Sequence, residues 1–215
     1  GEEVRLFLCR DRREGRVAGI AACALHECFV AGRPQKVVYL FGLRVRREYA
    51  ASRVLFAFPR LYEETVERFR RQGVSHFLTT ILKDNVLARR VLTKRRTHMP
   101  EYRLLCPYRT LTFRTRRRPP RLPASHLFRR AGGDDRAAIL KFLAEQGGRM
   151  AFFPARVEET FRSHPELSWE SFHLLIDRRR GDILACGAAW DQSAHKQYIV
   201  AGYQGALRWV RPLSA

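Results

Sequence analysis

The stretch VVYLFGLRVRREYAASRVLFAFPRLYEETVERFRRQ, residues 37–72, decides the fold that the sequence predicts. Its first nine residues are an apolar run typical of a strand, and a basic turn, residues 46–53, follows them. From there apolar residues recur every three or four positions with Glu and Arg between them, which predicts a long amphipathic helix that contains Pro59. A strand that enters a helix through a turn gathers free backbone N–H groups and the helix dipole, so this unit is suited to hold phosphate.

The residues before this stretch predict an antiparallel meander. Residues 4–10 alternate as a strand, residues 16–30 form a long apolar strand, and residues 35–45 are the third strand. The charged turn 11–15 and the turn Ala31-Gly32-Arg33-Pro34 separate the three strands.

The residues after the stretch predict a further strand, a short helix and two closing strands. The strand covers residues 74–82, and Asp84 or Asn85 opens the helix as its N-cap, with Leu87 and Val91 as its anchors. The closing strands are residues 102–106 and 110–113.

Residues 114–124 are rich in Pro and Arg, lack acidic residues, and therefore predict a linker. Residues 1–113 would form one domain and residues 125–215 would begin a second. In the second part the pattern predicts, in order, a strand, two helices and three strands: 128–130, 134–148, 153–161, 172–177, 183–190 and 197–202.

This order, together with Asn85-x-x-Ala88 after the strand at 74–82, resembles the GNAT N-acetyltransferase superfamily. The resemblance implies an α/β (α+β) fold, a mixed and mainly antiparallel sheet flanked by helices. Residues 1–113 correspond to the C-terminal portion of one GNAT-like domain and residues 125–215 to the N-terminal portion of another, so a tandem protein present as a fragment is expected. A single circularly permuted domain is the alternative.

The resemblance also implies acetyl-CoA as acyl donor and a set of cofactor-binding positions. Leu43 and Val45 match the end of the family's cradle strand, Tyr49 its usual aromatic residue, and Asn85 an asparagine that contacts the cofactor arm. Ala51, Arg53 and Leu55 stand where the family has small residues, mostly Gly, which lets the backbone approach phosphate closely. The expected cofactor-binding residues are Leu43, Arg44, Val45, Tyr49, Ala50, Ala51, Ser52, Arg53 and Asn85.

No catalytic residue is assigned from the sequence. The position at which the family often has a Tyr acid is Leu92. Glu27 and His26 are the candidate bases, and Tyr102 and Tyr108 are alternative acids, although strand-end and packing roles are the simpler interpretation of all four. Main-chain N–H groups near Leu43 could polarise a thioester carbonyl without any special side chain.

The predicted function is therefore acetyl transfer from acetyl-CoA to a small-molecule or peptide amine. A catalytically inactive GNAT-like module that binds acyl-CoA or a partner is the alternative. A basic nucleic-acid-binding protein is the third, because the formal net charge is +20. Five scattered cysteines without metal-ligand spacing favour reduced thiols in the cytoplasm and no metal site. No apolar run is long enough to span a membrane, and the sequence predicts no oligomeric state.

Overall fold

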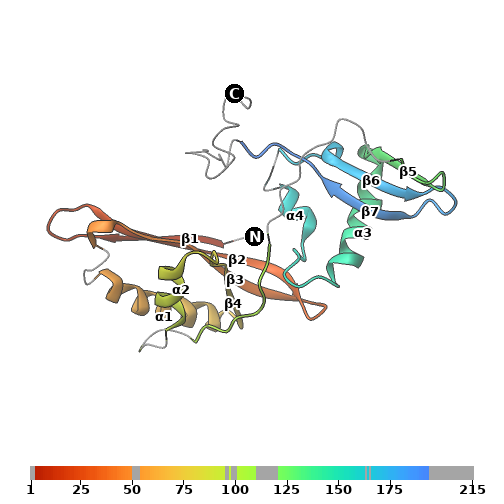
Figure 1. Cartoon of the computed structure of the whole chain (residues 1–215). Coiled ribbons are helices and arrows are strands. Elements are labelled where there is room, and N and C mark those ends of the chain that lie inside the picture. The colour runs from red at the N-terminus through yellow and green to blue at the C-terminus, as the bar shows by residue number, and fades with distance from the viewer. Residues whose placement is uncertain are drawn as a thin grey trace, which may run out of the picture. The chain divides into compact units, whose positions relative to one another are not determined.

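The computed structural model describes residues 3–49, 54–94, 97, 101–109, 121–162, 164 and 166–193, with the backbone alone at 54–57 (Figure 1). The chain divides into two compact units. Unit 1 is Gly1–Arg121 with Leu140–Arg162, and unit 2 is Leu122–Ile139 with Ser163–Ala215. The predicted strands at 110–113 and 197–202, and residues 114–120 of the predicted linker, lie outside the described residues.

Unit 1 is built on a four-stranded sheet of order β1-β2-β3-β4 (Figure 1). The strands are β1 Glu3–Arg10, β2 Val17–Val30, β3 Arg33–Val45 and β4 His76–Thr79. The first three pair antiparallel, which confirms the predicted meander, and β4 pairs parallel to β3. A parallel neighbour requires a crossover, and helix α1, Val54–Arg71, supplies it.

Helix α1 packs its apolar side against one face of this sheet. Phe69 from α1 and Val74 just beyond it are buried with Cys23 of β2 and Val38 of β3. The predicted wet face is confirmed, since its charged residues are exposed: Glu63, Glu64, Glu67, Arg68, Arg70 and Arg71. The helix continues through Pro59 without a break in its assigned length.

Three predictions about the end of unit 1 are wrong in detail. Strand β4 covers four residues rather than nine, because the chain leaves the sheet after Thr79. The predicted strand at 102–106 is absent, since residues 101–109 form no regular element, and Leu104 is 84% exposed with no core to face. In α2, Val86–Thr93, Leu87 is 70% exposed and is therefore no anchor.

The far end of β2 pairs with residues 152–155, which we call the edge segment. The Phe29 N–H donates to the Phe153 carbonyl at 2.8 Å, the Phe152 N–H to the Phe29 carbonyl at 2.7 Å, and the Ala155 N–H to the Glu27 carbonyl at 2.8 Å. Strand β1 pairs with β2 only up to Leu25, and β3 occupies the opposite edge. The edge segment therefore extends the row of β1, and all of these residues belong to unit 1.

Unit 2 contains an antiparallel sheet of order β5-β6-β7, with β5 His126–Arg130, β6 Phe172–Asp177 and β7 Ile183–Ala188. Between β5 and β6 the chain forms helices α3, Arg136–Gly147, and α4, Val157–Arg162. Only the start of α3, up to Ile139, belongs to unit 2, and the rest of α3 and all of α4 belong to unit 1. The predicted order of strand, two helices and two strands is thus confirmed, and the predicted bounds of β6 are those observed.

A bidentate ion pair fixes the start of α3 in unit 2. Arg129 donates to Asp135 through Nη1 at 2.6 Å and through Nη2 at 2.7 Å, and the Gly132 N–H donates to the same carboxylate at 2.8 Å. These bonds, the guanidinium first, hold the pKa of Asp135 down at about 2. The ion pair therefore joins the residue directly before α3 to strand β5.

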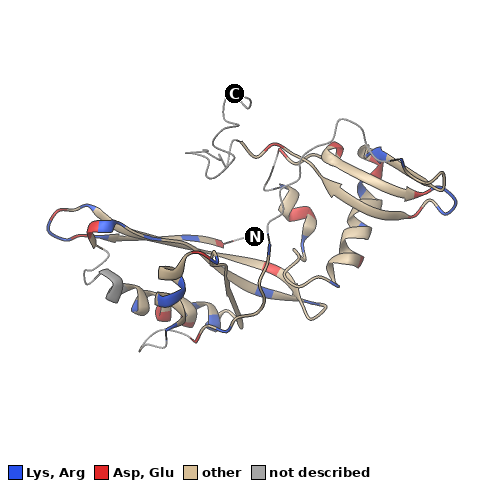
Figure 2. Cartoon of the chain, in the orientation of Figure 1, with Lys and Arg blue, Asp and Glu red and all other residues tan. Residues whose placement is uncertain are grey.

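Both units combine a mainly antiparallel sheet with few helices, which confirms the mixed α+β architecture. Lys and Arg occur on elements throughout the chain, interspersed with Asp and Glu (Figure 2). No helix among the described residues has both the length and the apolar composition needed to cross a bilayer. All five cysteines are described, and none of them forms a disulfide.

Candidate functional site

The candidate site lies in unit 1, where β3 and β4 part. Their parallel register ends at the pair Leu40 and Thr79, whereas β3 continues to Val45. Beyond Leu40, the backbone of β3 keeps its partners on β2 and loses those on β4. After Thr79 the chain turns away and enters α2, so the splayed strands leave a space between them.

A cavity of about 390 Å³ occupies this space, a size that suits a small ligand or part of a larger one. One wall is residues 40–44 of β3, and another is residues 79–82 together with Asn85, Ala88 and Leu92. Helix α1 contributes a third wall of two aromatic residues, one Leu and one Thr, and Tyr102 completes the lining on a non-helical segment.

A β-bulge shapes the β3 wall of the cavity. Ile20 pairs with Arg44 and Ala22 with Phe41, so Gly42 and Leu43 together face a single residue of β2. Gly42 has φ of 67°, which Gly tolerates and other residues resist. A bulge of this kind bends its strand and leaves backbone polar groups outside the ladder. These groups lie in the wall of the cavity.

Two tyrosines form the polar part of the cavity wall between α1 and the 101–109 segment. The rings of Tyr62 and Tyr102 have centroids 6.2 Å apart at an interplanar angle of 53°. Burial is the main cause that raises the pKa of both phenols, and a hydrogen bond between them raises the pKa of Tyr62 further while it lowers that of Tyr102.

Two of the threonine hydroxyls in the wall donate to nearby backbone. Thr65 Oγ1 donates to the Leu61 carbonyl at 2.6 Å, and Thr79 Oγ1 donates to the Leu40 carbonyl at 2.8 Å. Their oxygens keep acceptor capacity. The second bond also ties β3 to β4 at the point where the two strands separate.

Three of the predicted cofactor residues meet at this cavity, namely Leu43, Arg44 and Asn85. The Asn85 Oδ1 accepts the Ala88 N–H at 3.0 Å, so Asn85 is the N-cap of α2 and a wall residue at the same time. Val45 and Tyr49 are not among the lining residues, and Tyr49 instead hydrogen-bonds Asp11. Ala50, Ala51, Ser52 and Arg53 lie outside the described residues.

The candidate bases are not brought to the cavity. Ala22 is the β2 residue in the wall nearest to Glu27, and five strand positions separate them, about 16 Å at 3.3 Å per residue. The Glu27 carboxylate also forms an ion pair with Arg156 Nε at 2.7 Å. His26 lies one position closer. Among the described residues that line the cavity, none is Asp, Glu or His.

The candidate acids divide clearly. Leu92, at the position where the resemblance places a Tyr acid, is in the wall and carries no proton donor. Tyr108 is 64% exposed and is not among the lining residues, whereas Tyr102 is. Tyr62 lies on the apolar side of α1 together with Val66 and Phe69. Helical periodicity alone cannot separate a core position from a cavity wall, so no signal in the sequence distinguished it.

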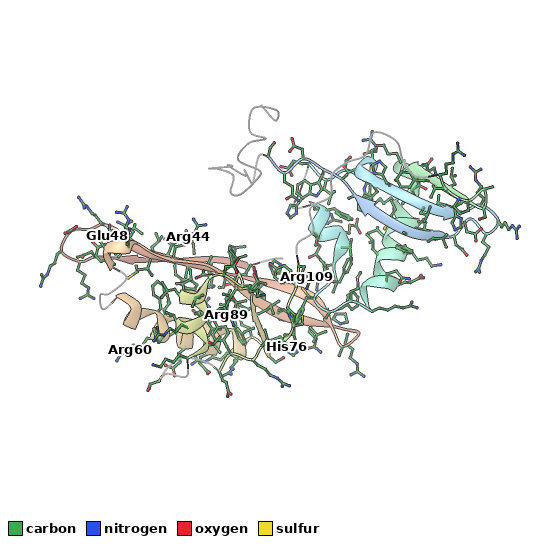
Figure 3. The ribbon with its side chains drawn as sticks, viewed as in Figure 1. Arg44, Glu48, Arg60, His76, Arg89 and Arg109 are labelled. Atoms are coloured by element: carbon green, nitrogen blue, oxygen red, sulfur yellow. The ribbon has the colours of Figure 1, made fainter. Side chains whose placement is uncertain are left out.

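Three of the elements around the cavity carry arginine residues. Figure 3 shows Arg44 on β3, Arg60 on α1 and Arg89 on α2. Arg44 is itself in the wall, and Arg89 Nη1 donates to the Lys83 carbonyl at 3.4 Å. Within the described part of the chain, no group of three or more His, Cys, Asp or Glu residues could hold a metal ion. The surroundings are therefore suited to an anionic ligand rather than to a cation.

Comparison with known proteins finds no matching family model and no similar curated protein. Some solved structures are similar to part of the chain, and three of them are structures of acetyltransferases. One is an acetyltransferase of Trypanosoma brucei, 19% identical, which matches 47% of this chain and 68% of its own with a TM-score of 0.34. Another is aminoglycoside 6'-N-acetyltransferase AAC(6')-IG from Acinetobacter haemolyticus, 14% identical, which matches 51% of this chain and 72% of its own with a TM-score of 0.34.

A third similar structure is AAC(6')-Iy in complex with a bisubstrate analogue, CoA-S-monomethyl-acetylneamine. It is 17% identical, covers 51% of this chain and 70% of its own, and has a TM-score of 0.36. Each of these three comparisons covers about half of this chain. The chain spans about two thirds of the length of these proteins.

Proposed function

We propose that this chain belongs to an acyl-CoA-dependent N-acyltransferase of GNAT type, with acetyl-CoA as the donor and an amine as the acceptor. The observation that carries the proposal is the cavity beside the splayed edge of β3, with the bulge at Gly42 and Leu43 in its wall. The remaining features support it but do not carry it.

The cavity suits the extended arm of coenzyme A for a physical reason. That arm is a flexible chain with two amide groups, and an unpaired strand edge offers N–H and C=O groups at regular intervals to such a chain. The walls are largely apolar, which favours the methylene groups between the amides. The thioester carbonyl would accept a hydrogen bond from the main chain near Leu43 or Arg44.

The phosphates of the donor would lie toward the basic turn that follows β3. Arg44 stands in the cavity wall, and Arg46 and Arg47 come directly after the strand. Charge-assisted bonds from guanidinium groups would compensate in part for the glycines that this turn lacks. We include Val45, Tyr49, Ala50, Ala51, Ser52 and Arg53 in the proposed binding region on the strength of the resemblance alone.

The proposal extends to the organisation of the protein. Residues 1–113 would be the C-terminal portion of one GNAT-like domain, residues 114–124 a linker, and residues 125–215 the N-terminal portion of a second. The acceptor would be a small-molecule or peptide amine. The cytoplasm is the proposed compartment, because the five described cysteines form no disulfide.

A catalytically inactive GNAT-like module is the second candidate, and one observation favours it. None of the described residues in the cavity wall can act as a carboxylate or imidazole base, and transfer to an ammonium group requires loss of a proton. Such a module would bind acyl-CoA, or a partner, without turnover.

Titration with acetyl-CoA tests the proposal, with thermal unfolding of the chain as readout. Ligand at 100 times its dissociation constant stabilises the folded state by about 2.7 kcal/mol. For a chain of this size that corresponds to a rise in Tm of roughly 5–10 °C. Release of thiol in the presence of an aminoglycoside, a polyamine or a lysine peptide would identify the enzyme.

The outcomes separate the candidates. Stabilisation with thiol release supports the transferase, and stabilisation without release on any amine supports the inactive module. No change in Tm with acetyl-CoA refutes both. In that case, affinity for DNA or RNA that falls steeply with salt would support the nucleic-acid alternative, since such binding depends on released counterions.

A further inference from the structure

The cavity extends from the splayed edge of β3 into the space between the sheet and α1. We call this part of the cavity the recess, and its lining residues are Phe7 of β1, Ala21 of β2, Leu40 of β3, and Phe58, Leu61 and Thr65 of α1. Phe7 and Ala21 are direct neighbours in the sheet, and Phe7 also packs against the core cluster that α1 covers. The recess is therefore the part of the cavity that enters the interior of unit 1.

Two small side chains leave room in the recess, Ala21 on the sheet and Thr65 on the helix. On either side of them α1 meets the sheet with a phenylalanine. A Cβ atom at Gly19 would lie 3.1 Å from the Phe58 ring, and Phe69 is fully buried in the core cluster. Protein interiors are close-packed, so open space between two filled layers reflects the small residues at that layer. The recess is thus bounded at both ends along the helix.

The side chains of the recess offer a ligand no charge and little polarity. None of its described lining residues is charged, and Thr65 carries their one hydroxyl group. This hydroxyl donates to the Leu61 carbonyl at 2.6 Å, so its proton is used within α1. A polar group that entered the recess would lose its water without gaining a side-chain donor, whereas a hydrocarbon would be stabilised by burial. The recess therefore suits an alkyl chain.

The recess begins beside the bulge, where the proposed thioester lies. The bulge residues Gly42 and Leu43 face Ala21 as their single partner on β2, and Ala21 in turn pairs with Phe7 on β1. Neighbouring strands are about 4.8 Å apart, so Phe7 lies two strands, or about 10 Å, from the bulge across the sheet. An acyl chain that starts at the bulge would follow this row of residues into the recess and would meet Phe7 at its far end.

We infer that the donor of this protein carries an unbranched acyl chain longer than acetyl, and that the recess binds this chain. Ala21 and Thr65 give the acyl chain room, and Phe7 limits its length. The inference rests on the proposed function and specifies its donor. An acetyl group has a single methyl beyond its carbonyl and reaches no farther than Ala21, whereas each further methylene group buries apolar surface against the recess. The three residues select the donor and take no part in the transfer.

Equilibrium binding of a series of acyl-CoA donors tests the inference. Calorimetric titration of the full protein chain would give the dissociation constants of acetyl-, butyryl-, hexanoyl- and octanoyl-CoA, which share the same nucleotide and arm. Burial of one methylene group is worth about 0.8 kcal/mol, and ordering of the acyl chain offsets part of this, so the affinity should rise about two- to fourfold per methylene group. Hexanoyl-CoA should therefore bind at least about tenfold more tightly than acetyl-CoA.

Three variants locate the bound acyl chain. Ala21→Leu fills the recess from the sheet and should make the affinity nearly independent of acyl-chain length. Phe7→Leu places a smaller side chain at the far end and should favour octanoyl-CoA over hexanoyl-CoA more strongly than wild type does. Ala185→Leu is the matched control, because it makes the same substitution at an exposed position of β7 outside the cavity, and it should behave as wild type.

The outcomes distinguish this inference from the proposed function. If acetyl-CoA binds but the affinity does not rise with acyl-chain length, the role of the recess is overturned and the donor site stands. A rise that persists in Ala21→Leu has the same meaning, because the acyl chain is then bound elsewhere. If none of the donors binds the wild type, both proposals fail. Retained binding of acetyl-CoA shows that Ala21→Leu is folded, and the wild-type series together with Phe7→Leu decides the matter if it is not.

Discussion

Substitution of Gly42 by Ala should weaken acetyl-CoA binding far more than its effect on stability would suggest. Gly42 has φ of 67° and forms the bulge in the cavity wall. Ala disfavours this backbone conformation by about 1–2 kcal/mol. The lower conformational entropy of the unfolded chain with Ala offsets about 0.4–1 kcal/mol of this destabilisation. A net loss of roughly 1 kcal/mol lowers Tm by about 2–4 °C for a chain of this length.

Steric overlap does not add to this cost. A Cβ atom at Gly42 would have the Ala22 Cβ as its nearest neighbour, at 3.9 Å, which is ordinary contact. Backbone strain is therefore the source of the destabilisation in Gly42→Ala. The chain relieves it by a shift of residues 41–44, and that shift moves the groups proposed to hold the donor. We expect the affinity for acetyl-CoA to fall about tenfold or more, since loss of a single satisfied hydrogen bond is worth about that factor.

Gly15→Ala is the matched control. Gly15 has φ of 69°, almost the same as Gly42, and a Cβ there would meet no atom within 4 Å. It lies in the turn between β1 and β2 and is not among the cavity residues. The two variants should lose similar Tm, and calorimetric titration should show weaker binding for Gly42→Ala alone. Equal affinities in the two variants would refute the role of the bulge.

Three further substitutions test other parts of the structure. Asp135→Asn should lower the free energy of unfolding by about 1 kcal/mol at pH 7. This is well below the roughly 2.4 kcal/mol that a pKa of about 2 implies for Asp135, because solvent screens a partly exposed ion pair. Since folding lowers this pKa, urea unfolding should show the destabilisation above pH 4, and the difference from wild type should disappear as the pH falls to 2. Gly147→Ala should lower the free energy of unfolding by about 1–3 kcal/mol, because the new Cβ would lie 2.5 Å from a ring carbon of Phe153. Gly148→Ala is the control, because the nearest neighbour of its Cβ would be 3.8 Å away, and thermal unfolding should show a smaller fall in Tm for it. Asn85→Ala removes the N-cap of α2. The α2 amides should then exchange hydrogen faster, and the affinity for acetyl-CoA should fall. Unchanged hydrogen exchange in α2 would contradict the capping role.

The elements of this fold could be predicted where local patterns and burial agree. The meander, α1 with its charged outer face and the strands β5 and β6 follow from alternation, periodicity and turn residues. The segment 101–109 shows the limit of that approach. Its apolar residues have strand propensity, but no core covers them, so the pattern alone gave the wrong structure.

The site was less predictable, because its shape depends on pairing between distant residues. Asn85 belongs to the Asn85-x-x-Ala88 motif in the sequence, and the structure places it in the cavity wall together with Leu43 and Arg44. The point at which β3 leaves β4, and the proximity of Tyr62 to Tyr102, depend on tertiary register that no local sequence pattern encodes. The same holds for Glu27, which lies on the right strand but several positions from the cavity.

The edge segment has a consequence for the order in which the protein matures during synthesis. The end of β2 is complete early, but its partner residues 152–155 are added about 125 residues later, some 6–25 s at ordinary rates of elongation. Throughout that interval the backbone at 27–29 is an open strand edge, which can pair with other chains. A nascent chain would therefore depend on chaperones over this window, and cleavage within residues 114–124 would cut the covalent link between the edge segment and the strand that it protects.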